Sequence, residues 1–249
     1  MRISRSAIWI PVCAVAIVCL GLALPAHADT VFTDGTMDLT NYTTVGPVAT
    51  GPVVVTDETC SSPCGNPGSA LEINFAYSGA ASAQVGFVNN TFTYDPSAQG
   101  DITSITASVD KNLTSTATAG NTFHPTIEQD GIFYIASIAG PGLSGATGGT
   151  TGYNTLSSAL DAADFLEYDF STGVTGTANP NFDGDLMLFG LTQISSNMAG
   201  QENLTAYYDN LSFDIASTPV ATPEPSGLLL LTSGLAGLIG FSRRKLRLT

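Results

Sequence analysis

The sequence predicts an all-β fold, a two-sheet antiparallel β-sandwich. Apolar and polar residues alternate with a period of two over several segments, as expected for strands with one buried face. Gly, Pro, Asn and Ser residues separate these segments, and helical periodicity is scarce. Strands joined by such turns favour two antiparallel sheets packed face to face.

Three segments show the alternation most clearly. Their apolar faces consist of Leu71, Ile73, Phe75 and Tyr77, then Ile105, Ala107 and Val109, then Leu211, Phe213 and Ile215. Two denser apolar runs, Gly131 to Ile138 and Leu186 to Thr192, predict central strands buried on both faces. One short helix is expected from Thr155 to Ala163, where Leu156 and Leu160 lie four residues apart.

The N-terminus predicts a secretory signal peptide. Arg2 and Arg5 precede an apolar region from Ala7 to Leu24. Ala26 and Ala28 then form an A-x-A cleavage pattern, so the mature chain is expected to begin after Ala28.

The C-terminus carries a second signal with three parts in a fixed order. Pro223, Glu224 and Pro225 precede an apolar run from Gly227 to Phe241, and Arg243, Arg244, Lys245 and Arg247 follow it. This order gives an extended element, a segment able to enter a bilayer and a positive stop on the cytoplasmic side. The alternative is an ordinary single-pass anchor that follows a chance Pro-Glu-Pro.

These residues resemble the PEP-CTERM sorting signal of bacterial surface proteins. The resemblance implies transient membrane anchoring and cleavage near Pro-Glu-Pro by an exosortase-type membrane transpeptidase. The chain then divides into a signal peptide (1–28), a β-sandwich domain (29–217), a Pro-rich linker (218–225) and a sorting helix with a basic tail (226–249). The expected destination is the cell surface or the extracellular matrix, reached through a membrane-anchored precursor.

The segment between the two signals is strongly acidic. Of the 21 acidic and seven basic residues, all acidic ones except Glu224 but only one basic one, Lys111, lie between residues 29 and 222, which gives a formal charge of −19. Such a charge repels phosphates and anionic headgroups and so excludes nucleic-acid binding. It attracts divalent cations, and it equally suits a surface that only keeps a secreted protein soluble.

Two cysteines remain in the mature chain, Cys60 and Cys64. In an exported protein they predict a disulfide, whose small ring contributes only about 2 kcal/mol. A zinc site is the alternative, but it needs two more ligands, and His124 is the one histidine of the mature chain.

Three short elements resemble the jelly-roll sandwiches of carbohydrate-binding modules and laminin-G-like domains. They are the Phe-x-Asp-Gly element at Phe32 to Gly35, the Gly-rich approach from Gly65 to Phe75, and Asp-Asn with alternating apolar residues from Tyr207 to Phe213. The resemblance implies a structural calcium between the first and last strands, with Asp34 and Asp209 as ligands. The alternative is a plain turn at Asp34 and an exposed carboxylate at Asp209.

An acidic cluster leaves an enzymatic alternative open. Two of its carboxylates could act in glycoside hydrolysis, one as the acid and one as the base or nucleophile. An EF-hand loop from Asn181 is excluded, because Leu186 stands where the loop needs glycine and Thr192 where it needs a bidentate acid. The members of the cluster are Asp161, Asp164, Glu167, Asp169, Asp183 and Asp185.

Two other patterns point to no catalytic chemistry. Gly140 to Gly145 matches G-x-G-x-x-G, but the sequence that follows does not start a helix, so a loop is expected there. A Ser-His-Asp arrangement would have to use His124, and no Gly-x-Ser-x-Gly element is present. Packing or capping is the expected role of His124.

Sugar-binding domains stack sugar rings on exposed aromatic side chains, and the mature chain retains no tryptophan for this role. Among its tyrosines are Tyr42, Tyr94, Tyr153 and Tyr168, and expected loop positions favour Tyr42 and Tyr153 as ligand contacts, with core or rim packing as the alternative. Two functions remain open. One is a non-enzymatic surface or matrix protein that binds a glycan such as exopolysaccharide, or calcium. The other is a secreted carbohydrate-active enzyme.

Overall fold

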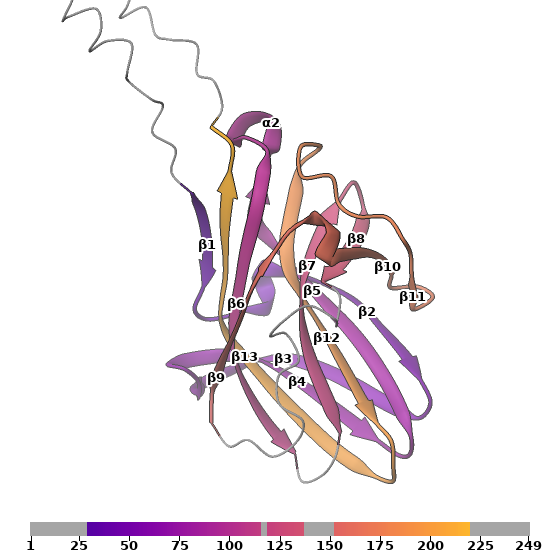
Figure 1. The fold of residues 1–249 in the computed structure, drawn as a ribbon. Helices are drawn as coiled ribbons and strands as arrows, with labels where there is room; N and C mark the ends of the chain where they lie inside the picture. Colours follow the sequence, from indigo (N-terminus) through magenta and orange to yellow (C-terminus); the bar gives the residue numbers. More distant parts are fainter. Residues whose placement is uncertain (1–28, 116–118, 137–151, 220–249) are drawn as a thin grey trace, which may run out of the picture. The chain divides into compact units, whose positions relative to one another are not determined.

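The computed structural model describes residues 29–115, 119–136 and 152–219, and Ala28–Thr218 form one compact unit (Figure 1). The predicted signal cleavage at Ala26 and Ala28, the Gly-rich loop from Gly140 and the C-terminal sorting signal lie outside the described residues. Within the described ranges, no helix is long and apolar enough to cross a membrane.

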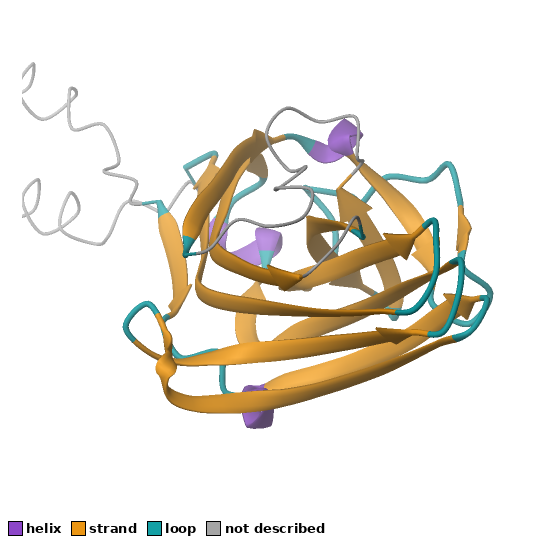
Figure 2. Cartoon of the chain, turned by 90° about the horizontal axis from the view of Figure 1, so that it is seen from below, coloured by secondary structure: helices purple, strands orange, loops and turns teal. Residues whose placement is uncertain are grey.

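Strands dominate the described chain and form two antiparallel sheets (Figure 2). The six-stranded sheet has the order β3 (Val53–Gly65), β4 (Gly68–Tyr77), β13 (Glu202–Ser217), β6 (Ile102–Ser115) and β9 (Asn154–Leu160), with β1 (Thr30–Asp34) also paired to β13. The seven-stranded sheet has the order β11 (Val174–Thr175), β10 (Phe165–Asp169), β8 (Ile132–Ala136), β7 (Gly120–Gln129), β12 (Met187–Asn197), β5 (Ala81–Tyr94) and β2 (Tyr42–Thr50). The predicted two-sheet sandwich is confirmed.

Within the described residues, only short helices interrupt the strands: η2 (Leu39–Asn41), α2 (Pro96–Gln99) and η3 (Ala162–Asp164). The predicted helix from Thr155 to Ala163 is wrong, because most of these residues form β9. Leu156 and Leu160 pair across from Val109 and Ile105 of β6. A spacing of four residues fits the strand period of two as well as a helical turn, and pairing with an exposed edge of the sheet decides between them.

The core lies between the two sheets, and the period-two pattern shows which side chains enter it. All ten apolar residues of the three alternating segments are at most 3% exposed. An aromatic cluster then joins the sheets. Phe213 of β13 lies 5.3 Å from Phe189 of β12, and Phe32 of β1 stacks 5.3 Å from Phe92 of β5, measured between ring centroids. Such contacts bury the largest apolar areas in a sandwich core.

The two dense apolar runs contribute internal strands of the seven-stranded sheet, as predicted, but Ile132 at the start of β8 is 41% exposed, so burial on both faces is incomplete there. β12 lies between β7 and β5, and both its core side chain Leu191 and its outward side chain Thr192 are fully buried. β8 lies between β10 and β7. The predicted disulfide between Cys60 and Cys64 is also present, at the end of β3.

Candidate ligand-binding site

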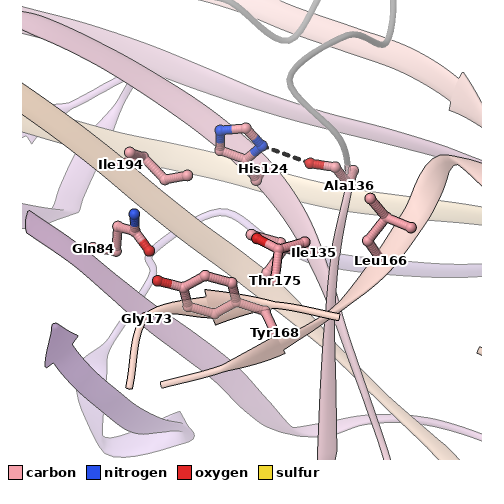
Figure 3. A pocket seen from close by; sticks show the side chains of 9 residues that line it. All are labelled: Gln84, His124, Ile135, Ala136, Leu166, Tyr168, Gly173, Thr175 and Ile194. Atoms are coloured by element: carbon pink, nitrogen blue, oxygen red, sulfur yellow. Dashed lines mark hydrogen bonds between the residues drawn. The ribbon is translucent and has the colours of Figure 1, made fainter. Parts of the chain in front are cut away.

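A pocket of about 250 Å³ lies on the outer face of the seven-stranded sheet (Figure 3). It is lined by Gln84 of β5, His124 of β7, Ile135 and Ala136 of β8, Leu166 and Tyr168 of β10, Thr175 of β11, Ile194 of β12, and Gly173 between β10 and β11. Strand alternation explains the composition of this face. Phe123 and Val85 point into the core, so their neighbours His124 and Gln84 point the other way.

His124 is held rigidly in the wall of the pocket. Its side chain is 1% exposed, its Nδ1 donates to the Ala136 carbonyl at 2.6 Å, and its Nε2 lies 2.9 Å from the Thr122 hydroxyl. A carbonyl only accepts, so Nδ1 carries the proton and a neutral ring accepts at Nε2. Burial lowers the pKa of His124, the Ala136 carbonyl partly offsets this, and the nearby Lys111 lowers it further. The predicted packing role fits this arrangement.

Two polar atoms of the pocket have no hydrogen-bond partner within the described ranges. The Gln84 Oε1 and the Tyr168 hydroxyl are buried, and neither makes a hydrogen bond to any of the described residues. Figure 3 shows the two groups on the same side of the pocket. A buried polar atom without a partner costs about 1–3 kcal/mol. Two such atoms beside one cavity can therefore form hydrogen bonds with a ligand that enters the cavity, the Gln84 Oε1 as an acceptor and the Tyr168 hydroxyl as a donor or acceptor.

Residues 169–175, which we call the strap, form one wall of the pocket and cross the outer face of the sheet. The Asp169 carboxylate holds its first turn by accepting from the Ser171 N–H and hydroxyl, both at 2.7 Å, and from the Thr172 hydroxyl at 2.7 Å. These donors lower the pKa of Asp169 to about 2. The strap ends against the opposite edge of the sheet, where a Cβ added to Gly173 would lie 2.8 Å from Val48 of β2.

The residues of the acidic cluster lie at η3, on β10 and on the segment before β12. Asp161 and Asp164 form a capping box on η3, and Asp169 caps the strap. Asp183 and Asp185 are exposed on the segment before β12. In the part of the chain that the structure describes, these five carboxylates therefore serve local turns or face solvent, while Glu167 is partly buried on β10.

The predicted calcium ligands lie near each other at one end of the six-stranded sheet. Asp209 is fully buried and accepts from the N–H groups of Asn66 and Asn210, while Asp34 accepts from the Thr36 and Met37 N–H groups and from the Tyr42 hydroxyl. Burial raises the pKa of Asp209, and the charges of Asp110 and Asp34 also raise it, against the effect of the N–H donors.

Among the described residues, Asp34 and Asp209 do not belong to a cluster of metal-binding side chains. Across residues 29–115, 119–136 and 152–219, no group of three or more acidic, histidine or cysteine side chains could hold a metal ion. The calcium site stays a prediction. If it exists, excess calcium should raise the thermal midpoint of the purified protein, because a cation relieves the repulsion among Asp34, Asp110 and Asp209. An equal midpoint in calcium and in chelator would contradict it.

The two favoured tyrosines lie away from the pocket. Tyr42 is not in a loop but begins β2, is 7% exposed and donates to Asp34 at 2.9 Å, so its ring offers no free face to a sugar. Tyr153 is partly buried and donates to the Cys64 carbonyl. Burial, with the charges of Asp209 and others, raises its pKa to about 12. Both side chains therefore make structural contacts near Asp34 and Asp209, at one end of the six-stranded sheet.

The pocket residues Gln84 and Tyr168 were not selected from the sequence. Alternation places Tyr168 and Leu166 on one face of β10 and Phe165 on the other. It favours the wrong face as the buried one, because Leu166 and Tyr168 share a wholly apolar face whereas Phe165 shares its face with Glu167 and Asp169, yet Phe165 is the one in the core. The signal that the sequence does contain is Phe165 itself, which puts an aromatic residue on both faces of β10.

Residues 221–245 are a PEP-CTERM protein-sorting motif. The predicted resemblance to a PEP-CTERM sorting signal is thereby confirmed, since the match includes Pro223 to Pro225 and Arg243 to Lys245. No curated protein matches the chain.

Several solved structures of carbohydrate-binding modules are similar to the sandwich. The family 11 module of cellulosomal cellulase Lic26A-Cel5E of Clostridium thermocellum is 12% identical, with 78% of this chain and 99% of that chain covered and a TM-score of 0.43. The family 30 module of Cel9D-Cel44B of the same organism is 10% identical over 76% and 99%, with a TM-score of 0.41. The mannan-recognising module TmCBM27 is 11% identical over 78% and 100%, with a TM-score of 0.39.

Proposed function

We propose that this chain is an exported, non-enzymatic surface protein that binds a neutral glycan in the pocket between the seven-stranded sheet and the strap. The observation that carries the proposal is a pair of polar atoms without a hydrogen-bond partner among the described residues, Gln84 Oε1 and the Tyr168 hydroxyl, in a pocket otherwise lined largely by apolar groups. A sugar hydroxyl can donate to the amide oxygen and exchange a hydrogen bond with the tyrosine. The C–H faces of the ring can pack on Leu166 and Ile194.

The chemistry of the wall favours a neutral ligand. Among the described residues that line it, the only ionisable groups are His124, whose pKa is lowered, and Tyr168, whose pKa is raised, so both are uncharged near neutral pH. The charge of −19 between residues 29 and 222 repels uronic-acid and sulfated polymers. The volume lies below the range of about 300–1,000 Å³ typical of drug-sized ligands, so it suits about one sugar residue.

Binding of the full-length protein in detergent to neutral and anionic polysaccharides tests this function. We expect retention on at least one neutral glucan, mannan or xylan and none on alginate or pectin. Binding to no neutral polymer, or to anionic polymers alone, would contradict the proposal.

The enzymatic alternative is tested on the same polymers. We expect no release of reducing ends or unsaturated products on prolonged incubation. Turnover that is abolished by Asp183→Asn or Asp185→Asn, but not by Asp161→Asn, would replace the binding function with a catalytic one.

The PEP-CTERM motif supports processing by an exosortase-type transpeptidase after transient membrane anchoring. We predict that replacing Pro223, Glu224 and Pro225 by alanines leaves the unprocessed precursor in the membrane fraction, because the cleavage element is lost while the apolar run remains. Cell fractionation with an antibody to the domain measures this. Alanines at Thr218, Pro219 and Val220 provide the control, and normal processing of the Pro-Glu-Pro variant would refute the assignment.

A further inference from the structure

We propose that the pocket takes the terminal sugar residue of a glycan chain, rather than an internal stretch of it. This inference rests on the glycan binding proposed above and concerns which part of the chain is held. It follows from how the strap divides the outer face of the seven-stranded sheet.

The strap closes the face on one side of the pocket. A Cβ added to Gly86 of β5 would lie 2.7 Å from the Phe170 ring, and one added to Gly46 of β2 would lie 3.5 Å from it, so this ring sits directly on the two strands. Gly173 meets Val48 at the same edge. Figure 1 accordingly places β11 beside β2, although these strands are at opposite ends of the sheet order.

Aromatic contacts fix the Phe170 ring in this position. Its centroid lies 4.9 Å from that of Tyr168 and 5.3 Å from that of Phe133, and both contacts are edge-on. Tyr168 thus presents its hydroxyl to the pocket while its ring supports the ring of Phe170. We call the Phe170 ring, seated on β5 and β2, the barrier. The ring of Phe170 needs Gly86 beneath it, because any side chain there would collide with it.

The sheet surface behind the barrier is covered. Thr192 pairs with Gly86, and its hydroxyl lies 2.7 Å from that of Thr126. Both threonines point outward from the sheet, yet both are fully buried. An open groove would leave such side chains accessible to a second and third sugar residue, so the described residues form no continuous groove past the pocket here.

The opposite side of the pocket is more open. The next outward-facing side chains on this side are Ser82, Ser196 and Thr122, each two residues from Gln84, Ile194 and His124 on the same strands. All three are partly exposed. A ligand that enters from this side meets the strap after about one residue, since the pocket measures about 250 Å³. The rest of its chain then extends into solvent on the entry side. The pocket is therefore built for a chain end.

Calorimetric titration with neutral oligosaccharides of one to six residues tests the inference. The probes are the gluco-, manno- and xylo-oligosaccharide series, each compared with its polymer. For the series that binds, we expect the Kd of the mono- or disaccharide to lie within about threefold of that of the hexasaccharide. We also expect the binding capacity per gram of polymer to rise as the polymer is shortened by partial hydrolysis, in proportion to its chain ends.

The outcomes separate this inference from the glycan-binding function. A Kd that falls more than tenfold from one residue to six, with a capacity that is independent of polymer length, would overturn end recognition and leave glycan binding intact. No binding of any oligosaccharide or neutral polymer would overturn both. These measurements use the wild-type protein and so do not depend on a variant that folds.

A variant gives an independent check. Phe170→Ala removes the barrier and should make the affinity depend on chain length, with the hexasaccharide favoured over the monosaccharide at least fivefold. Val54→Ala, an exposed change on the other sheet, is the matched control and should leave the ratio unchanged. If Phe170→Ala folds, as judged by its thermal transition, and keeps the wild-type ratio, the strap does not set the ligand length and the inference fails.

Discussion

In Lys111→Met, the free energy of unfolding is expected to become almost independent of pH between 7 and 9, whereas that of the wild type rises. Lys111 is 3% exposed in the core. Its Nζ donates to the Asn121 carbonyl at 2.8 Å and lies 5.8 Å from the Tyr208 ring centroid. Burial lowers its pKa from 10.5 to about 7. The side chain thus loses its proton at a much lower pH in the folded state than in the unfolded chain.

The sign of the effect follows from proton binding. Between pH 7 and 10.5 the unfolded chain holds a proton at Lys111 that the folded protein has released, so stability rises with pH. The gain is about 1.4 kcal/mol for each pH unit, or about 2–3 kcal/mol from pH 7 to pH 9. It is lost as the pH falls through about 7. Above pH 9 the ionisation of tyrosines in the unfolded chain obscures the trend.

Urea denaturation at pH 6, 7, 8 and 9 measures this dependence. Lys111→Arg is the informative control, because a guanidinium keeps its charge throughout and should remove the slope while lowering stability at every pH. Lys111→Met should remove the slope and keep or raise the stability at pH 6. A slope in Lys111→Met equal to that of the wild type would show that another group titrates.

Tyr168→Phe is expected to weaken glycan binding without loss of stability. The hydroxyl makes no hydrogen bond to the described residues, so its removal costs the fold no bond and relieves a buried polar group. If a sugar supplies the missing partner, binding loses about 0.5–1.5 kcal/mol, or roughly 2- to 10-fold in Kd. The thermal midpoint should stay the same or rise.

The opposite signs of the two effects make this a sharp test. Gln84→Met keeps the length of the side chain, removes its Oε1 and should behave in the same way. Tyr207→Phe and Gln201→Met, which lie away from the pocket, are matched controls and should change neither property. A lower midpoint in Tyr168→Phe with unchanged Kd would mean that its hydroxyl serves the fold.

The pocket illustrates why sequence reasoning selected other tyrosines. Tyr42 and Tyr153 follow polar, turn-rich segments, which suggested loops, yet the Tyr42 ring enters the core and its hydroxyl meets Asp34. Whether an aromatic ring next to a turn is exposed depends on what folds over it from other strands. Phe170 shows the same dependence, because its position on Gly86 joins residues far apart in the sequence.

The sequence by itself determined the sorting signal, the strand pattern, the disulfide and the acidic charge of the domain. Each of these depends on the order of neighbouring residues or on composition, so no long-range contact is needed to recognise it. Only the tertiary structure decided that residues 154–160 form a strand, that Lys111 lies in the core, and that the strap crosses the sheet to enclose a pocket. These features arise from contacts between segments that are distant in the sequence. A local pattern such as two leucines four residues apart fits both a helix and a strand, so it cannot decide between them.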